Sequence, residues 1–330
     1  MSDAYQLILD ELSRVRRALV TTHVRPDGDA LGSTAALVLA MRLKGIAVDL
    51  LTLSHVPTKY AFVLNDAGVQ AREIIKDLPA DFSLDGYDAF VCVDTGTWSQ
   101  LPGLQPHVEK FAGRKLVIDH HLTQQDWADA KLVVKDAAAA AEIVAELVER
   151  WGVPLTPPMA QAIYVGLVSD TGWFQFSNTR PRTLRLAAAL LEAGADNDRV
   201  YQLIYQSERA QRIALQTRGQ STLQLLADNR VAVMWITKAD FESTGAGVND
   251  TEALVNYPLQ VKTVQASVLL VEPTDGGPIR VSFRSKGQID VAKFAEQFGG
   301  GGHARAAGAK FDGTLDAARE RIVAKLLEVV

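Results

Sequence analysis

The chain has 330 residues, of which 48% are hydrophobic, enough for two domains that each bury a core of their own. Its formal net charge of −5 lies within residues 1–212, where 26 Asp and Glu face 21 Lys and Arg, while residues 213–330 hold 13 of each sign. A chain this acidic, with no long basic stripe, is a poor candidate for binding long nucleic acid through many phosphates, although short anionic substrates are not excluded.

The chain shows no sign of a membrane or secretory protein. No apolar run approaches the roughly 18 to 20 residues of a membrane span, and the N-terminus lacks a basic region followed by an apolar one. The single cysteine, Cys92, excludes a disulfide within the chain and is expected to pack in a core. We therefore expect a cytoplasmic protein.

The first half of the chain alternates between apolar runs with strand character and helical stretches. Strands are predicted at about residues 17–23, 47–53, 88–94 and 115–119, and helices at residues such as 30–44 and 137–151. This alternation predicts an α/β fold with a mostly parallel sheet and helices on both faces. In such sheets ligands bind outside the carboxyl ends of the strands.

Four acidic or histidine-bearing segments follow apolar runs that we predict to be strands, the last of these runs being residues 163–168. They are His23-Val24-Arg25-Pro26-Asp27-Gly28-Asp29, Asp94-Thr95-Gly96, Asp119-His120-His121 and Ser169-Asp170-Thr171-Gly172. Their carboxylates and imidazoles should converge on one edge of the sheet. This mixture, without thiolate, favours Mn, Fe, Co or Zn over calcium and predicts a metal-dependent hydrolytic centre. Alone, the Asp27-Gly28-Asp29 turn could equally be a polar loop in which Asp29 caps a helix.

The second half is predicted to form a smaller domain after a helical connector. A helix at residues 182–193 closes at Gly194, and residues 198–227 read as mostly helical. The expected division is a catalytic metal-binding domain at 1–195, a connector at 196–227 and a mixed α/β domain at 228–330. Within the last, strands are predicted at 230–236, 264–272 and 279–284, and a closing helix at 315–330.

The second domain carries an anion-binding pattern of its own. Residues 299–308 form a glycine-rich run in which backbone N–H groups can approach an anion closely. Upstream, Arg284, Ser285 and Lys286 end a predicted strand with two cations and a hydroxyl. We expect a phosphate or carboxylate pocket here. The alternative is a flexible surface loop beside a solvated cluster of charges.

Together these motifs resemble the DHH phosphoesterase superfamily and the C-terminal domain that accompanies it. Within that superfamily the chain is similar to the short bacterial oligoribonucleases of the nanoRNase type, which also remove phosphate from 3′-phosphoadenosine 5′-phosphate. The resemblance implies Mn²⁺-dependent hydrolysis of short RNA to mononucleotides, by a hydroxide that bridges two metal ions. The substrates would be short oligonucleotides or a nucleoside bisphosphate, and a homodimer is possible.

The resemblance also implies roles for single residues. His23, Asp27 and Asp94 would bind one Mn²⁺, and Asp29, Asp94, His120 and Asp170 the other. Asp119 would orient an imidazole, and His121 would face the scissile phosphate. The far end of the substrate would be held by Arg284, Ser285, Lys286, Gly300, Gly301, Gly302 and His303.

Three other functions stay open. A phosphodiesterase acting on cyclic or linear dinucleotides would present the same bond to the same metals. An inorganic pyrophosphatase shares the metal motifs, but the glycine-rich C-terminal signature argues against it. A catalytically silent nucleotide-binding regulator is disfavoured, because every position that the resemblance assigns to a metal ligand is filled.

Overall fold

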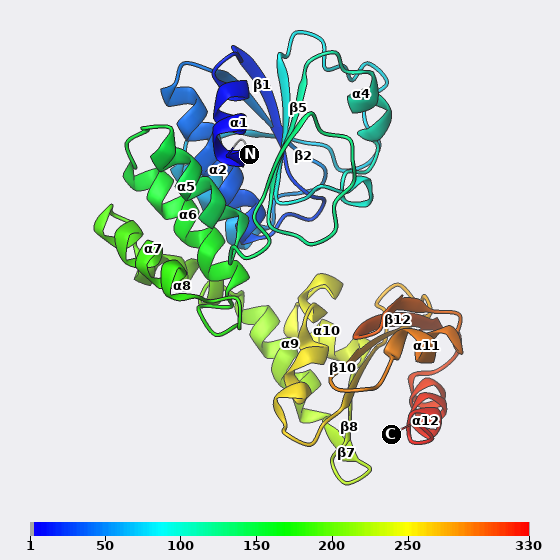
Figure 1. Ribbon diagram of the computed structural model, residues 1–330. Helices are drawn as coiled ribbons and strands as arrows, with labels where there is room; N and C mark the ends of the chain where they lie inside the picture. Colours follow the sequence, from blue (N-terminus) through cyan, green and yellow to red (C-terminus); the bar gives the residue numbers. More distant parts are fainter. Residues whose placement is uncertain (1–2, 330) are drawn as a thin grey trace. The chain divides into compact units, whose positions relative to one another are not determined.

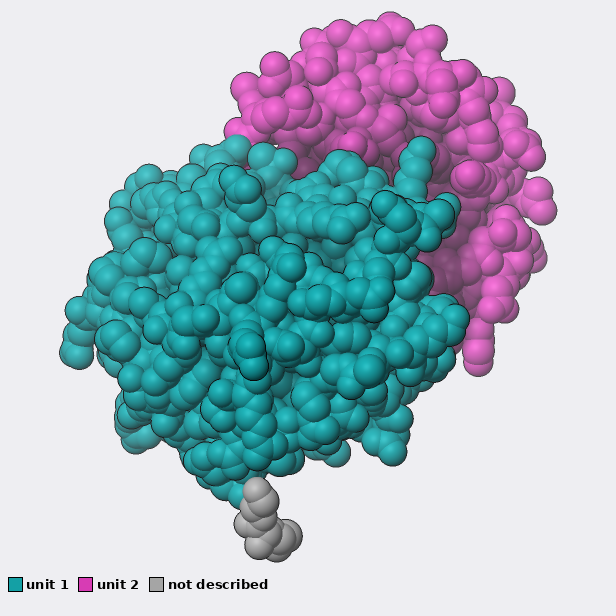
Figure 2. All heavy atoms as spheres, turned by 90° about the horizontal axis from the view of Figure 1, so that it is seen from above, with its two compact units in different colours: residues 1–207 teal, residues 208–330 magenta. Residues whose placement is uncertain are grey.

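The computed structural model describes residues 3–329, which fall into two compact units. The chain divides after Ser207, and the next unit begins at Glu208 (Figure 2). This division lies inside the segment predicted to be a connector. Among the helices of residues 3–329, none combines the length and the hydropathy that a membrane span needs.

Unit 1 is built on a sheet of six parallel strands in the order β3-β2-β1-β4-β5-β6. Figure 1 labels β1, β2 and β5 of this sheet. The strands are β1 Arg17–Thr21, β2 Ala47–Thr52, β3 Ala71–Glu73, β4 Ala89–Val93, β5 Arg114–Asp119 and β6 Ala130–Val133. The four strands predicted from residue 17 to residue 119 are confirmed as β1, β2, β4 and β5. Because β1, β4 and β5 are neighbours, the residues that follow them meet at one edge of the sheet.

Alternate residues of the central strands pack into two separate cores. In β4, Val91 and Val93 contribute to the larger core, whereas Phe90 and Cys92 contribute to the smaller one on the opposite face. The larger core includes residues of α1 Ala4–Leu12, α2 Gly28–Leu43, α3 Ala61–Asp66, α5 Ala140–Arg150 and α6 Pro157–Asp170, and the smaller one includes α4 Gln105–Lys110. The predicted α/β fold with helices on both faces is therefore confirmed. The helices α7 Pro181–Glu192 and α8 Asn197–Tyr205 follow α6.

The predicted strand at residues 163–168 is wrong, because these residues belong to helix α6. Every residue from Met159 to Val168 is buried, so the helix has no polar face, and its apolar run does not reveal a helical period. The helix runs antiparallel to α2 at very close range, since a Cβ added to Gly32 would lie 2.3 Å from the carbonyl oxygen of Ala162. Gly28 at the start of α2 is beside Ser169 near the end of α6, which brings Asp170 to the same edge as the strand ends.

Unit 2 contains a mixed sheet of six strands in the order β11-β12-β10-β9-β8-β7, in which the β8–β9 pair is parallel and the other pairs are antiparallel. The strands are β7 Gln224–Leu226, β8 Val231–Ile236, β9 Ala266–Val271, β10 Ile279–Ser285, β11 Gly301–His303 and β12 Ala306–Phe311. This confirms the predicted mixed α/β domain, and the glycine-rich segment forms the β11–β12 hairpin.

Helices cover both faces of this second sheet. Those packed into its two cores are α11 Val291–Glu296 and α12 Leu315–Leu326 on one side, and α9 Ala210–Ser221 and α10 Lys238–Thr244 on the other. Short 3₁₀ helices complete the chain at Thr58–Tyr60, Trp98–Gln100, Val248–Thr251 and Leu254–Gln260.

Candidate metal centre

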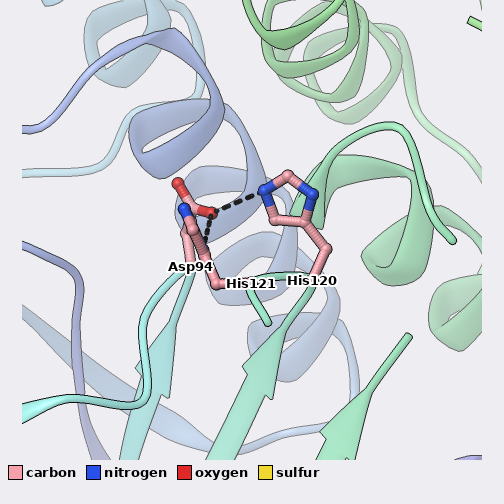
Figure 3. Close-up of side chains that lie close together, drawn as sticks. All are labelled: Asp94, His120 and His121. Atoms are coloured by element: carbon pink, nitrogen blue, oxygen red, sulfur yellow. Dashed lines mark ion pairs between the residues drawn. The ribbon is translucent and has the colours of Figure 1, made fainter. Parts of the chain in front are cut away.

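Asp94 lies at the middle of the site, directly after β4. Its φ of 65° is left-handed, a conformation that Asp tolerates better than most residues, and its side chain is almost fully buried. Its Oδ1 is 3.4 Å from Nε2 of His120, and its Oδ2 is 3.5 Å from Nε2 of His23. Figure 3 shows the carboxylate facing His120 and His121 from the neighbouring strand end. One carboxylate therefore faces imidazoles from the strand ends on both sides of it.

His23 and Asp27 form the side of the site next to β1. The Nδ1 of His23 is 3.0 Å from the carbonyl oxygen of Val24, which leaves Nε2 directed at Asp94 and, at 3.9 Å, at Asp27. Asp27 is the N-cap of α2, because its Oδ1 accepts hydrogen bonds from the N–H groups of Asp29 and Ala30. The residue that caps α2 is therefore Asp27, and the same carboxylate also faces the site.

Asp29, His120 and Asp170 form the opposite side. Asp29 is fully buried and accepts hydrogen bonds from the N–H groups of Ala140 (2.6 Å) and Ala141 (2.9 Å), at the start of α5. Nε2 of His120 lies 3.2 Å from Oδ2 of Asp170 and 3.9 Å from Oδ2 of Asp29. The other ring nitrogen of His120 faces the carbonyl oxygen of Ala137 at 3.4 Å, which fixes the ring orientation.

The pKa values show that this cluster of carboxylates needs positive charge. Burial alone would lower the pKa of His23, but Asp27 and Asp94 raise it to about 10. Burial likewise opposes protonation of His120, and Asp170 and Asp94 raise its pKa to about 11. The pKa of Asp29 is raised well above its ordinary value by burial and by the charges of Asp94 and Asp170. A bound cation would supply the charge that protons otherwise provide.

The atoms of the cluster fit divalent metal ions. Oδ1 of Asp94 and Nε2 of His120 are among the buried side-chain atoms of the described residues that have no hydrogen-bond partner, so both are available as ligands for a cation. Three groups bring their ligand atoms within 4.8 Å of one another: His23, Asp27 and Asp94; Asp29, His120 and Asp170; and Asp94, His120 and His121. Carboxylate with imidazole suits Mn, Fe, Co or Zn.

Asp119 and His121 form a separate pair beside this cluster. Asp119 ends β5, and its buried Oδ1 accepts hydrogen bonds from the backbone N–H groups of His120 and His121. The same oxygen lies 2.7 Å from Nδ1 of His121. Burial raises the pKa of Asp119, but hydrogen bonds from His121 and Gln124 outweigh it and lower the pKa below its usual value. The hydrogen bond to Asp119 raises the pKa of His121, whose side chain stays about half exposed (55%). Asp119 thus contacts an imidazole that solvent can reach.

Sequence reasoning missed three supporting contacts of the site. Gln124 donates a hydrogen bond to Asp119, and the Nδ2 of Asn178 donates to the carbonyl oxygens of Asp170 and Ala138. The start of α5 anchors Asp29. None of these belongs to the four motifs, and each contact depends on tertiary structure. Only a polar residue a few positions beyond a motif, as Gln124 and Asn178 are, could have signalled them.

The candidate substrate-binding residues all belong to unit 2. Ser285 donates a hydrogen bond to the carbonyl oxygen of Ile289, and Nζ of Lys286 donates to those of Leu259 and Val261. These polar groups therefore have partners within the unit. Arg284 donates to the carbonyl oxygen of Phe283.

Arg284 and His303 lie in one row across the second sheet. Arg284 pairs with Ala306, which pairs in turn with His303 of β11, so the three side chains share a face with a small residue in the middle. A neighbouring hollow of about 400 Å³ is lined by Arg280, Val281, Ser282, Gly299, Gly300, Gly308, Ala309 and Lys310. The face therefore offers several cationic groups around small residues.

The three glycines of the hairpin differ in what they require. A Cβ on Gly300 would lie 2.2 Å from the carbonyl oxygen of Gly308, and one on Gly302 would lie 2.5 Å from that of Ala306. Close packing of the hairpin alone explains both. A Cβ on Gly301 would meet nothing within 4 Å, so packing does not require this glycine.

Comparison with known proteins agrees with this arrangement. Residues 17–167 match the DHH family, N-terminal domain, and residues 228–330 match the DHHA1 domain. The bifunctional oligoribonuclease and PAP phosphatase NrnA of Thermus thermophilus is 30% identical, over 98% of this chain and 93% of that protein.

Solved structures share the fold. An exopolyphosphatase-related protein from Bacteroides fragilis, 25% identical, superimposes with a TM-score of 0.81 over 98% of this chain and 96% of that one. The exonuclease RecJ bound to manganese, 16% identical, shows a likeness of fold alone, with a TM-score of 0.53 over 98% and 92%. With both domains present in order and a relative 30% identical over nearly its whole length, the chain belongs to the DHH family and is a metal-dependent hydrolase of the phosphoesterase type.

Proposed function

We propose that the chain hydrolyses short oligoribonucleotides to mononucleotides and removes phosphate from 3′-phosphoadenosine 5′-phosphate, with two Mn²⁺ ions bound. The observation that carries this proposal is the position of Asp94. Its Oδ2 faces His23 and its Oδ1 faces His120, so one carboxylate can join two groups of ligands. The ions of two-metal sites in phosphatases and nucleases lie about 3.5–4 Å apart, a separation that a carboxylate bound to both ions can bridge.

The two groups of ligands lie on either side of Asp94. His23 and Asp27 would complete one site, and Asp29, His120 and Asp170 the other. When bound, two such ions supply Lewis acidity that lowers the pKa of a water and neutralises negative charge at the phosphate. Manganese suits a mixture of carboxylates and imidazoles, and the structurally similar RecJ is described as bound to it.

His121 is accessible to a substrate phosphate. The ionised Asp119 can only accept hydrogen bonds, so Nδ1 of His121 donates to it and Nε2 is the ring nitrogen that would meet the substrate. The ring is about half exposed, whereas the Asp94 carboxylate beside it is buried. His121 can therefore stabilise phosphate charge or transfer a proton at Nε2.

The substrate class rests on the relative from Thermus thermophilus and on unit 2. That relative is named for activity on oligoribonucleotides and on PAP, and its likeness extends through both domains. Arg284 and His303 on one face, with the open Gly301 backbone near them, can bind a second phosphate of a short substrate. Short substrates also suit an acidic protein, which is a poor candidate for binding long nucleic acid through many phosphates.

The test compares an RNA dinucleotide, a long RNA, 3′-phosphoadenosine 5′-phosphate and cyclic di-AMP under one condition, with Mn²⁺ and with EDTA. We expect rapid Mn²⁺-dependent hydrolysis of the dinucleotide and of the bisphosphate, and slow hydrolysis of the long RNA. A preference for cyclic di-AMP would replace the proposed substrates by a signalling nucleotide at the same metals. Binding without hydrolysis of any of the four would contradict the proposal.

A further inference from the structure

Gln124 binds the same buried carboxylate that orients His121. Its Nε2 donates to Oδ2 of Asp119 at 2.5 Å and also lies 3.2 Å from the carbonyl oxygen of His121. The opposite oxygen of Asp119, Oδ1, receives the two histidine backbone N–H groups and faces Nδ1 of His121. Among the described residues, Gln124 is the hydrogen-bond donor found at Oδ2. The carboxylate is thus held from both of its oxygens.

Gly96 provides the space that Gln124 occupies. A Cβ on Gly96 would lie 1.9 Å from Oε1 of Gln124 and 2.8 Å from its Cδ, so no larger residue fits at position 96 while Gln124 keeps this position. The φ of Gly96 is not in the left-handed region, so its backbone alone does not require glycine. The glycine that follows Asp94 and Thr95 is therefore explained by the side chain of Gln124.

The backbone at Gly96 has little freedom to move away. Its carbonyl oxygen accepts hydrogen bonds from the N–H of Gln125 at 3.1 Å and from Nε1 of Trp127 at 3.0 Å. The Trp127 ring stacks on that of Trp98, with 4.7 Å between centroids, and the N–H of Trp98 donates to Oε1 of Gln125. These contacts hold the loop after β4 and the loop after β5 together around the Gln124 side chain.

We propose that Gln124 is a positioning residue that sets the plane of the Asp119 carboxylate and, through it, the orientation of the His121 ring. The terminal torsions of Asp and His are broad, so neither side chain fixes its own plane. The planes of the Asp119 carboxylate and of the His121 ring must therefore be set by hydrogen bonds. Gln124 supplies the bond to Oδ2 of Asp119, and His121 is bonded to the other oxygen, Oδ1. Residues that orient metal-bound imidazoles in this way commonly affect metal affinity or activity by about 10- to 100-fold, and we expect an effect of the same size for His121 beside the metal centre. The inference rests on the proposed hydrolysis at this site.

The test uses Gln124→Ala, Gly96→Ala, the double variant, and Leu122→Ala as a control in the same loop, since Leu122 is 75% exposed. Steady-state hydrolysis of bis(4-nitrophenyl) phosphate with Mn²⁺ gives kcat and KM, while metal content and the melting temperature are measured in parallel. Gln124→Ala should lower kcat about 10- to 100-fold with little change in KM or in bound metal. Gly96→Ala should do the same, because its methyl group displaces Gln124.

The double variant separates a shared cause from two independent ones. Once Gln124 is truncated, the Gly96 methyl group has space, so the double variant should be no slower than Gln124→Ala. If the losses of kcat in the two single variants multiply in the double variant, the inference is overturned. It is also overturned if kcat of Gln124→Ala is unchanged, or if kcat falls only in proportion to the bound metal or to the melting temperature.

A second readout does not depend on activity. In metal-free protein labelled with ¹⁵N-histidine, the Nδ1–H proton of His121, assigned with His121→Asn, should shift in Gln124→Ala and Gly96→Ala but not in Leu122→Ala. An unchanged resonance would overturn the positioning role. If the unmodified protein hydrolyses no phosphodiester, the proposed function fails, while this resonance still decides the role of Gln124.

Discussion

Replacing Asp94 by Asn tests the shared ligand with the least disturbance of the fold. Asn has the size of Asp and also tolerates the left-handed backbone at this position, where Ala would add strain of about 1 kcal/mol. The change removes one negative charge and one ligand oxygen from a carboxylate that faces both His23 and His120. Both candidate metal sites should therefore weaken together.

The expected loss can be worked out for binding and for turnover. A ligand at a hundred times its Kd stabilises a protein by about 2.7 kcal/mol. For a unit the size of unit 1, which spans 207 residues, each kcal/mol raises Tm by about 2 to 4 °C, so each ion bound at that excess adds roughly 5 to 10 °C. Turnover should fall at least about a thousandfold, which corresponds to about 4 kcal/mol of lost transition-state stabilisation.

The assay is thermal unfolding with and without Mn²⁺, followed by hydrolysis of the RNA dinucleotide. The control is Asp81→Asn, which removes the same charge from an exposed residue of unit 1. We expect the control to keep the full Mn²⁺-induced shift and normal turnover, and Asp94→Asn to lose most of both while its Tm in EDTA stays near that of the unmodified protein. A folded Asp94→Asn variant that keeps the Mn²⁺-induced shift, or that turns over normally, would refute the shared-ligand assignment.

Three further predictions concern the second unit and the stability of the first. Gly301→Ala should leave Tm unchanged, since its methyl group meets nothing, but should raise KM for 3′-phosphoadenosine 5′-phosphate. Gly302→Ala should instead lower Tm, because the φ of Gly302 is 147° and its Cβ would lie 2.5 Å from a carbonyl oxygen. If Gly301→Ala leaves KM unchanged, the proposed phosphate pocket is contradicted. Arg284→Ala should raise KM more than it lowers kcat, because it would bind a remote group, and an effect in kcat alone would argue against that role. Glu11 is buried and accepts two 2.6 Å hydrogen bonds from the half-exposed Arg114, which lower its pKa. Glu11→Gln should therefore lower the free energy of unfolding by about 1 kcal/mol at pH 7, after allowance for solvent screening. This difference from the unmodified protein should disappear as the pH falls below about 4.3, the pKa of an unperturbed Glu, and through the lowered pKa of Glu11 in the folded protein. Urea unfolding at several pH values measures it.

The strands and the site motifs could be predicted because their signals are local. A parallel strand buried on both faces, such as Ala89–Val93, appears in the sequence as a short apolar run, and the polar residue after it marks the sheet edge. Asp94, Asp119 and His120 follow from this rule alone. The order of the strands then brings them together without further information from the sequence.

The error at residues 163–168 has the opposite cause. Burial on every side removes the polar face that identifies a helix, so helix α6 reads as an apolar run of strand length. Asp170 nevertheless lies at the predicted edge of the sheet, because the carboxyl end of α6 is beside the start of α2. The position of Asp170 is predicted correctly although the type of its element is not, because a strand and a helix that end at the same edge of the sheet both place their last residue there.

Asp29 shows why the competing cap interpretation and the metal interpretation were hard to separate. Helix α5 begins after Ala139, whose side chain cannot accept a hydrogen bond. The first two N–H groups of the helix instead donate to the carboxylate of Asp29, which lies 111 and 112 residues earlier in the sequence. The residue is therefore a cap, but of a different helix from the one its sequence suggests, and it also faces His120. Because a change at Asp29 would weaken the start of α5 along with any metal site, its loss of activity would not distinguish the two roles. Within residues 3–329, no helix N–H donates a hydrogen bond to the Asp94 carboxylate, and this is the physical reason for testing the metal centre there.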